Sequence, residues 1–382
     1  MSKYLIFAIG LFLSVAVCAQ ENYKEVSKSD SVKTYTGGKF YPVKSYDQNF
    51  KAKKPKNVIF MIGDGMGTSQ VFAGLTANGG HLFLENCKYS GFAKTQSANK
   101  YITDSAAGGT ALSSGVKTYN GAIGVNADSV AVETMLEKSE KKGLSTGLVS
   151  TSSITHATPA SFISHEAKRS YYEDIAADFL DTDVDVFIGG GYKHFTQRKD
   201  GRNLVDDLKG KGYQVLQDMN EISKVKSGKL AGLTAPEHNG RLDSREDMLP
   251  VATQTAINIL DDNNKGFFLM VEGSQIDWGG HQNNTIYLVE EMLDFDRAIG
   301  KALEFASNDK ETLIVITADH ETGGFSLVGG DMSTGMVKGA FTTGGHTAVM
   351  VPVFAYGPGA ENFTGIMDNT DIAKKIMNLL GL

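Results

Sequence analysis

The sequence has few cysteines and no long run of one charge. Of its two cysteines only Cys87 lies beyond the first twenty of the 382 residues, so a chain that has lost its N-terminal segment cannot form an internal disulfide. No Lys/Arg-rich run occurs and the formal net charge is −7, which argues against a nucleic-acid or anionic-membrane partner. No internal repeat or low-complexity tract is present either. Its hydrophobic share of 41% and charged share of 21% are typical of a soluble globular protein.

The first 19 residues have the pattern of a secretory signal peptide. Lys3 supplies a positive start, residues 4–17 are apolar, and small residues follow, so we predict cleavage after Ala19. This apolar stretch is shorter than the about 20 residues that a membrane-spanning helix needs. Lipidation of Cys18 is the alternative, although Val17 is bulky for the position before a lipoprotein cysteine. We therefore expect an exported protein that is periplasmic, with secreted and lipid-anchored forms as the alternatives.

The pattern of apolar runs predicts an α/β fold with a large, mostly parallel central sheet and helices on both of its faces. Runs typical of buried parallel strands occur at residues 57–62, 144–150, 184–188, 266–271 and 313–317. Helix-forming stretches occur at residues 68–75, 130–142 and 250–260. We expect one α/β domain over residues 57–382, preceded by a polar N-terminal arm at 20–56. Residues 193–249 are more charged and less regularly apolar, and we interpret them as an insertion outside the sheet core.

A candidate nucleophile lies in the stretch Thr-Asp-Ser-Ala-Ala-Gly-Gly-Thr at residues 103–110. Ser105 follows an acid and precedes small residues and a helix-capable run, which places its hydroxyl at a helix N-terminus where backbone N–H groups can receive an anion. The stretch alone is a weak signal, because a serine in this position is ordinarily a helix cap or a turn residue.

Acidic and imidazole side chains gather beside glycines at the predicted strand ends. Asp64 follows one buried strand, where a turn or capping role is the alternative, and no nucleotide P-loop pattern accompanies it. Another strand leads into Glu272, Asp277 and His281. The last two are four residues apart and share a face if the segment is helical, although the glycine pair between them also permits a looser turn.

Three further candidates come later in the chain. Asp319 and His320 follow the strand at 313–317, and His346 follows a glycine pair. Mixed carboxylate and imidazole ligands suit Zn²⁺, and carboxylate and hydroxyl oxygens suit Mg²⁺, so we expect more than one ion. Two ions about 3.5–4 Å apart can hold the attacking and leaving oxygens of an in-line displacement. Arg169 has two alternative roles: it is a solvent-exposed charge on a helix, or it binds two phosphoryl oxygens in a bidentate manner.

The motifs in which these residues lie resemble those of the bacterial alkaline phosphatases. The resemblance runs over about residues 57–359, and the motifs occur in the family's order. They are Ile-Gly-Asp-Gly-Met-Gly, Thr-Asp-Ser-Ala-Ala, Ala-Thr-Pro-Ala, Val-Glu-Gly-Ser-Gln-Ile-Asp, Thr-Ala-Asp-His-Glu and Gly-Gly-His-Thr.

The resemblance implies a role for each matched residue. Ser105 matches the nucleophile that becomes phosphoserine, and Arg169 matches the arginine that holds the phosphate oxygens. Asp277, His281 and His346 match the ligands of the zinc that activates the leaving group and water.

The remaining matches concern two further cations. Asp64, Asp319 and His320 match the ligands of a second zinc, which activates the serine. Asp64 also matches a ligand of a magnesium site, and Thr158 and Glu272 match the other protein ligands of that site. The implied reaction is hydrolysis of phosphate monoesters with a broad substrate range and an alkaline optimum, and family analogy implies a homodimer.

Two positions vary within that family and bear on the site. His156 stands where some members have aspartate, beside the magnesium site, which makes Mg²⁺ rather than Zn²⁺ occupancy less secure there. Trp278 stands where some members have lysine or histidine. We expect weaker retention of product phosphate than in a relative that has lysine at this position.

Three other functions compete with this interpretation. A sulfatase needs a cysteine or serine in a Cys/Ser-x-Pro-x-Arg context, which the residues after Cys87 do not supply. A phosphodiesterase can use the same two-metal site, and a comparison of p-nitrophenyl phosphate with its bis-ester distinguishes the two activities. A metal or phosphate binder without turnover would show no ester hydrolysis by metal-loaded protein at basic pH.

Overall fold

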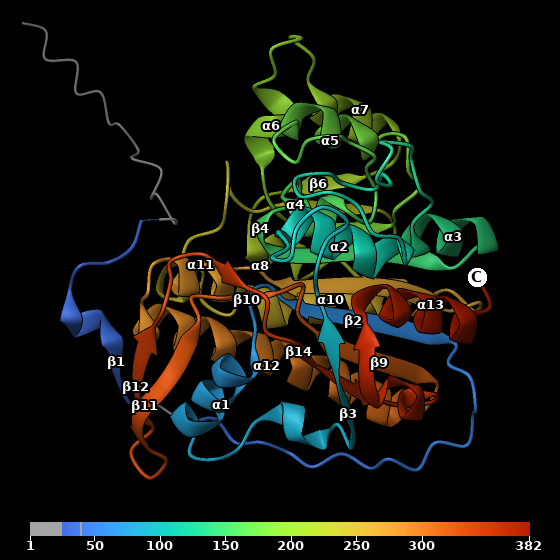
Figure 1. Ribbon diagram of the computed structural model, residues 1–382. Coiled ribbons are helices and arrows are strands. Elements are labelled where there is room, and N and C mark those ends of the chain that lie inside the picture. Colours follow the sequence, from blue (N-terminus) through green and yellow to red (C-terminus); the bar gives the residue numbers. More distant parts are fainter. Residues whose placement is uncertain (1–24, 39) are drawn as a thin grey trace, which may run out of the picture.

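The computed structural model describes residues 25–38 and 40–382, and it is organised around a ten-stranded sheet (Figure 1). The strand order is β15-β3-β14-β9-β2-β8-β4-β5-β7-β6. Strand β14 (Val351–Tyr356) pairs antiparallel with both of its neighbours, and every other pairing in the sheet is parallel. The predicted mostly parallel sheet is therefore confirmed.

The central strands are the apolar runs that the sequence indicates. They are β2 (Asn57–Gly63), β8 (Phe267–Gly273), β4 (Ser145–Ser153), β5 (Val186–Gly190) and β9 (Thr312–Thr317). Every residue of β2, β8, β5 and β9 is buried, as expected for strands covered on both faces. The strands at the β14 edge are β3 (Tyr89–Lys94) and β15 (Gly365–Asp368).

Helices cover the two faces of the sheet. Helices α10 (Met248–Leu260) and α12 (Thr285–Asp309) pack on each other and on one face. The other face carries α2 (Ser105–Ser114), α3 (Met135–Lys142), α4 (Ala157–Ala160) and α13 (Asn369–Leu380) (Figure 1). Helix α3 begins five residues later than predicted, because Thr134 caps it: the Thr134 hydroxyl accepts from the N–H of Glu137, whose carboxylate accepts from the N–H of Thr134.

The segment 193–249 is partly integrated into the sheet. Strands β7 (Leu230–Leu233) and β6 (Gln214–Leu216) extend the central sheet beyond β5. The expectation that the whole segment lies outside the sheet core is therefore wrong for these two strands. Helices α6 (Tyr192–Thr196) and α7 (Leu204–Gly210) lie with α5 (Tyr172–Asp178) in the upper part of Figure 1, away from the other helices. Whether the segment is an insertion stays a prediction.

The described part of the N-terminal arm lies along the body of the protein. Its strand β1 (Thr34–Thr36) joins a separate three-stranded sheet with β12 (Met336–Phe341) and β11 (Phe325–Asp331). The arm also supplies Tyr41, whose hydroxyl donates to Asp296 Oδ2 at 2.7 Å. The predicted signal peptide at residues 1–19 and both cleavage alternatives lie outside the described residues. Among the described helices, none combines the length and the apolar character needed to cross a bilayer.

Candidate active site

The candidate nucleophile lies where the sequence places it, at the start of a helix. Ser105 is the first residue of α2 and is 2% exposed. The helix is capped by Asp104, whose Oδ1 accepts from the N–H of Ala107 at 3.1 Å. The Ser105 hydroxyl lies 3.3 Å from Nε2 of His320, one of the predicted metal ligands.

A cavity of about 400 Å³ opens above this serine. It is lined by Ile102, Thr103, Asp104, Ser105, Asn120, His156, Arg169, Asp277, His281 and His346. Arg169 donates to Asp104 Oδ2 at 3.1 Å and lies 3.2 Å from Nε2 of His156. The guanidinium is thus anchored beside the candidate nucleophile, a position suited to binding phosphoryl oxygens.

One group of predicted ligands consists of Asp277, His281 and His346. Nε2 of His281 lies 3.3 Å from Asp277 Oδ2 and 3.2 Å from Nε2 of His346, which lies 3.5 Å from Asp277 Oδ1. Each imidazole is oriented through its other nitrogen, by the carbonyl of Gly344 for His281 and that of Thr103 for His346. The three side chains can therefore present their ligand atoms to one ion.

Two of these ligands lie on one face of a helix, as the four-residue spacing predicts. Helix α11 (Gln275–His281) includes the glycine pair that made a looser turn an alternative. The pair is required by packing: a Cβ on Gly279 would stand 2.6 Å from the backbone of Leu288 in α12, and one on Gly280 would stand 2.8 Å from the carbonyl oxygen of Thr322. Glycine here allows the close approach of neighbouring backbone.

A second group lies deeper, at the ends of two parallel strands. Asp64 follows β2, and Asp319 and His320 follow the adjacent β9. Nε2 of His320 lies 3.5 Å from Asp64 Oδ1 and 3.3 Å from Asp319 Oδ2. Asp277 also comes close enough to share an ion with Asp64 and His320, so the first and second groups are contiguous.

A third group surrounds Glu272 at the end of β8. Ligand atoms of Asp64, His156 and Glu272 lie within 4.8 Å of one another, and all three side chains are buried. Thr158, in the short helix α4, is also fully buried. Asp64 therefore belongs to two groups, one with Asp277 and His320 and one with His156 and Glu272.

The donor atoms of these groups fit cations. Several buried oxygens have no hydrogen-bond partner among the described residues, namely both carboxylate oxygens of Asp64, Oε1 of Glu272, Oδ2 of Asp319 and the hydroxyl of Thr158. Buried polar atoms are normally paired, and a buried carboxylate without a partner is costly. Four of these five oxygens belong to carboxylates and the fifth to a hydroxyl, the ligand chemistry of divalent ions.

The pKa shifts of the buried acids and histidines also indicate that bound cations would stabilise the site. Burial, and then the charge of Asp319, raises the pKa of Asp64 well above its usual range. Burial, and then the charge of Asp277, raises the pKa of Asp319 to about 7. Burial lowers the pKa of His320 and of His346. Burial opposes ionisation of Asp277 too, but the positive charges of the surrounding histidines lower its pKa overall. Cations bound here would relieve the repulsion between the carboxylates.

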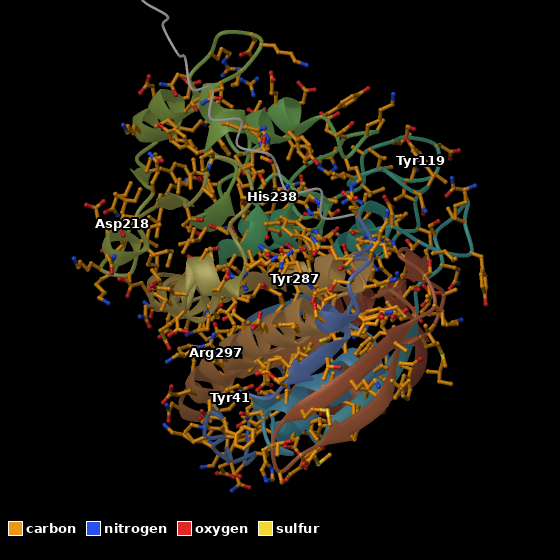
Figure 2. All side chains as sticks on the ribbon, turned by 90° about the vertical axis from the view of Figure 1, so that its left-hand side faces the viewer. Tyr41, Tyr119, Asp218, His238, Tyr287 and Arg297 are labelled. Atoms are coloured by element: carbon orange, nitrogen blue, oxygen red, sulfur yellow. The ribbon has the colours of Figure 1, made fainter. Side chains whose placement is uncertain are left out.

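Trp278 lies beside His156 and, like it, is buried. Its ring meets those of His156 and His238 edge-on, with centroids 6.2 Å and 4.9 Å apart. His238 belongs to the segment 193–249 and is labelled near the centre of the view in Figure 2, whereas Asp218 of the same segment is labelled at the edge of the molecule. Nδ1 of His238 accepts from the N–H of Ser153 at 3.0 Å. Part of that segment therefore contributes to the surroundings of the site.

The sequence analysis missed the residues that orient the ligands. Thr322 donates to Asp277 Oδ1 at 2.5 Å, and Glu321 accepts from the hydroxyl of Thr347, the neighbour of His346. These contacts join β10 (Glu321–Thr322) to the ligand segments at α11 and β13 (His346–Thr347). The position of Thr322 directly after the Asp-His-Glu motif was the only available signal.

The chain is similar to known proteins over most of its length. The family model described as alkaline phosphatase matches residues 55–340 and 333–382. Alkaline phosphatase 3 of Bacillus subtilis (strain 168) is 37% identical, and the match covers 85% of this chain and 89% of that protein.

Solved structures give the same result. The alkaline phosphatase from the Antarctic bacterium TAB5 is 44% identical, with a TM-score of 0.82 over 87% of this chain and 99% of that one. A mutant of the same enzyme, in which a histidine is replaced by aspartate, has Mg bound in its M3 site. It shares 44% identity with this chain, with a TM-score of 0.81 over 87% of this chain and 99% of that chain.

Proposed function

The chain belongs to the alkaline phosphatase family and is a phosphomonoesterase that uses metal ions, and from that premise we propose that it acts through a phosphoserine at Ser105. The observation that carries the proposal is the position of Ser105 at the N-terminus of α2, 3.3 Å from Nε2 of His320 and beside Arg169 in one cavity. The proposed nucleophile and the proposed phosphoryl-binding arginine thereby face the same cavity as the predicted ligands Asp277, His281 and His346.

Two chemical steps follow from this arrangement. The Ser105 oxygen attacks phosphorus as the bond to the ester oxygen breaks, and a water molecule then attacks the phosphoserine, releasing phosphate and restoring the hydroxyl. Arg169 holds two phosphoryl oxygens through both steps, and the N–H groups at the start of α2 face the same negative charge. Bound Zn²⁺ supplies Lewis acidity, which lowers the pKa of the serine hydroxyl and of water and stabilises the leaving oxygen.

We assign the ligands as the groups in the structure support. Asp277, His281 and His346 hold one zinc ion. Asp64, Asp319 and His320 hold the other, since mixed carboxylate and imidazole donors suit Zn²⁺.

For the third site we propose Mg²⁺, held by Asp64, Thr158 and Glu272. Carboxylate and hydroxyl oxygens suit Mg²⁺, and a nitrogen ligand from His156 is the feature that favours Zn²⁺ instead. In the His156→Asp variant an oxygen replaces this nitrogen. We expect Mg²⁺ to bind that variant at least about tenfold more tightly in calorimetric titrations, the order typical of changes to a metal's surroundings. Equal Mg²⁺ affinity in both proteins would remove His156 from the site.

The nucleophile assignment is tested with Ser105→Ala. Hydrolysis of p-nitrophenyl phosphate by the metal-loaded variant should fall by several orders of magnitude, while its content of bound metal stays as in the wild type, because the hydroxyl is not among the proposed ligands. Acid quenching of the wild type during turnover, followed by peptide mass spectrometry, should find phosphate on Ser105. Full activity of the alanine variant would exclude this serine as the nucleophile.

The natural setting of the enzyme is also part of the proposal. We propose export to the periplasm after cleavage at Ala19, and a homodimer by analogy with the family. Both are testable on the natural host's protein, by N-terminal sequencing of the mature chain and by sedimentation. Phosphate monoesters are the proposed substrates, and a preference for p-nitrophenyl phosphate over its bis-ester distinguishes this activity from a phosphodiesterase.

A further inference from the structure

Three serine hydroxyls surround one oxygen of the Glu272 carboxylate. Ser150 of β4 donates to Oε2 at 2.6 Å, and Ser274, which follows β8, donates to the same atom at 2.7 Å. The hydroxyl of Ser152 lies farther away, at 3.4 Å. Glu272 and all three serines are completely buried, so these hydroxyls take the place that water would have around an exposed carboxylate.

The serine hydroxyls also lie close to one another, with Ser150 Oγ 2.8 Å from Ser152 Oγ and 3.0 Å from Ser274 Oγ, so we infer the direction of each hydrogen from the other donors and acceptors. A serine hydroxyl has one hydrogen to donate and two lone pairs that accept. The backbone N–H of Ser152 lies 3.1 Å from the Ser150 oxygen and 3.0 Å from the Ser274 oxygen, so both oxygens accept from it. Their own hydrogens are then available to Glu272, whose negative charge makes it the strongest acceptor nearby.

The two oxygens of Glu272 consequently differ. A carboxylate oxygen offers about two lone-pair sites, and Ser150 and Ser274 fill both on Oε2. Oε1 has no hydrogen-bond partner among the described residues. A carboxylate oxygen of Glu272 also lies within 4.8 Å of ligand atoms of Asp64 and His156. The geometry thus leaves one oxygen available to a cation.

We propose that Ser150 and Ser274 are positioning residues that restrict Glu272 to a single ligating oxygen and thereby make the third site select small cations. The inference rests on the proposed assignment of Glu272 to that site. Mg²⁺ demands near-octahedral coordination and takes carboxylates through one oxygen, whereas the larger Ca²⁺ accepts more ligands and often both oxygens of a carboxylate. Serine hydroxyls on Oε2 therefore favour Mg²⁺ over Ca²⁺.

The test measures cation selectivity rather than activity. Protein loaded with two equivalents of Zn²⁺ is titrated with Mg²⁺ and, separately, with Ca²⁺ by calorimetry, for the wild type and for Ser150→Ala and Ser274→Ala. We expect each substitution to weaken Mg²⁺ binding about tenfold, the lower end of the effect of such supporting residues on metal affinity. We also expect the preference for Mg²⁺ over Ca²⁺ to fall, because Oε2 becomes available as a second ligand.

Two further variants calibrate this result. Ser152→Ala should have a smaller effect, since its hydroxyl is 3.4 Å from Oε2. Ser153→Ala is the matched control: this serine is also buried in β4, but its hydroxyl faces Thr155 at 2.8 Å and His194 at 3.3 Å. It should bind both cations as the wild type does.

The outcomes separate this inference from the proposed function. If the zinc-loaded wild type binds neither Mg²⁺ nor Ca²⁺, the assignment of the third site fails. If it binds Mg²⁺ while Ser150→Ala and Ser274→Ala retain its preference for Mg²⁺ over Ca²⁺, the inference is overturned, and a lowered melting temperature then marks a purely structural role. Each variant removes one of the two donors, so either one decides the question if the other does not fold.

Discussion

Arg169 is bonded to Asp104, the residue that caps the helix carrying the proposed nucleophile Ser105. The guanidinium donates to Asp104 Oδ2 at 3.1 Å, while Oδ1 of the same carboxylate accepts from the N–H groups of Ala107 and Gly121, each at 3.1 Å. One carboxylate therefore fixes both the start of α2 and the direction of the arginine. The Asp104 carboxylate therefore fixes the position of Arg169, the proposed phosphate-binding residue, relative to Ser105.

Replacing Asp104 by alanine should loosen the hold on phosphate. Arg169 loses its anchor, so we expect the inhibition constant for inorganic phosphate to rise several-fold, and loss of the helix cap should cost about 1 kcal/mol of stability. Inhibition assays and thermal unfolding measure the two effects. Asp218→Ala is the matched control, because Asp218 caps the distant helix α8 (Met219–Ile222), accepting from the N–H of Asn220 at 2.7 Å. An unchanged inhibition constant in the Asp104 variant would contradict the link to Arg169.

The stabilisation that bound metal gives should depend on pH between 6.5 and 8. Burial raises the pKa of Asp319 to about 7 in the folded, metal-free protein, against 3.8 for an unperturbed aspartate. Above about pH 4 the folded state holds a proton that the unfolded state has lost, so this group lowers the free energy of unfolding of the metal-free protein as the pH rises, and its effect levels off by about pH 8. His320 and His346, whose pKa values are lowered, are neutral in the folded state in this range. Their protonation in the unfolded state near pH 6.5 opposes the effect of Asp319 on stability, but it is common to the metal-loaded and the metal-free protein and leaves the difference between them unchanged.

The measurement is the difference in melting temperature between metal-loaded and chelator-treated protein. This difference should be larger at pH 8 than at pH 6.5, because metal binding replaces the proton at Asp319. Glu140 has a pKa raised to about 7 by burial, but it lies in α3 and should affect both forms of the protein alike. Glu140→Gln is therefore a control that leaves the difference unchanged. An equal difference in melting temperature at both pH values would show that burial and the neighbouring carboxylates do not raise the pKa of Asp319.

A positive charge at position 278 should strengthen the binding of product. The Trp278 ring lies edge-on to His156, whose Nε2 is 3.2 Å from the Arg169 guanidinium. In Trp278→Lys we expect the inhibition constant for phosphate to fall about tenfold, equivalent to about 1.4 kcal/mol. Trp278→Phe keeps an apolar ring without adding charge and should change the constant little. A lysine variant with the wild-type constant would rule out an electrostatic role for this position.

The strand ends that carry the site were predictable because their apolar runs are unambiguous. The runs before Asp64, Glu272 and Asp319 are buried strands, and parallel strands bring their carboxyl ends to one edge of the sheet. The position of Ser105 at the start of a helix was predicted correctly, because an acidic residue before a run of small, helix-forming residues is a recognisable N-cap. The grouping of ligands by ion depended on the family resemblance, since spacing along the chain does not determine which strand ends adjoin.

The rest depended on contacts that a single sequence does not encode locally. Ser274 is two residues from Glu272, but Ser150 reaches the same carboxylate oxygen from β4, which only tertiary pairing brings beside β8. The charged composition of 193–249 concealed two short strands, because the three-residue β6 is too short to show periodicity. The loop between β7 and α9 (Leu242–Arg245) likewise gave no sign that His238 contacts Trp278.

Thr322 joins the first and second groups of ligands, and its hydroxyl should therefore affect metal affinity. It donates to Asp277 Oδ1 at 2.5 Å and lies 3.2 Å from Nδ1 of His320, the ring whose Nε2 faces Asp64 and Ser105. The neighbouring glycine accommodates it: Gly65 has a φ of +72°, and a Cβ there would stand 2.7 Å from the Thr322 hydroxyl oxygen.

Thr322→Val keeps the shape of the side chain and removes this hydroxyl. Asp277 loses a hydrogen bond that fixes its rotamer, so we expect zinc to dissociate to a chelator about 10–100 times more readily, with a corresponding loss of activity at limiting zinc. Excess zinc should restore much of the activity, because the ligands themselves remain. Thr253→Val is the comparison, since this threonine is also fully buried but its hydroxyl donates within α10, to the carbonyl of Leu249 at 2.8 Å. If zinc is retained as in the wild type and activity is nevertheless lost, Thr322 acts on the reaction in another way than through Asp277.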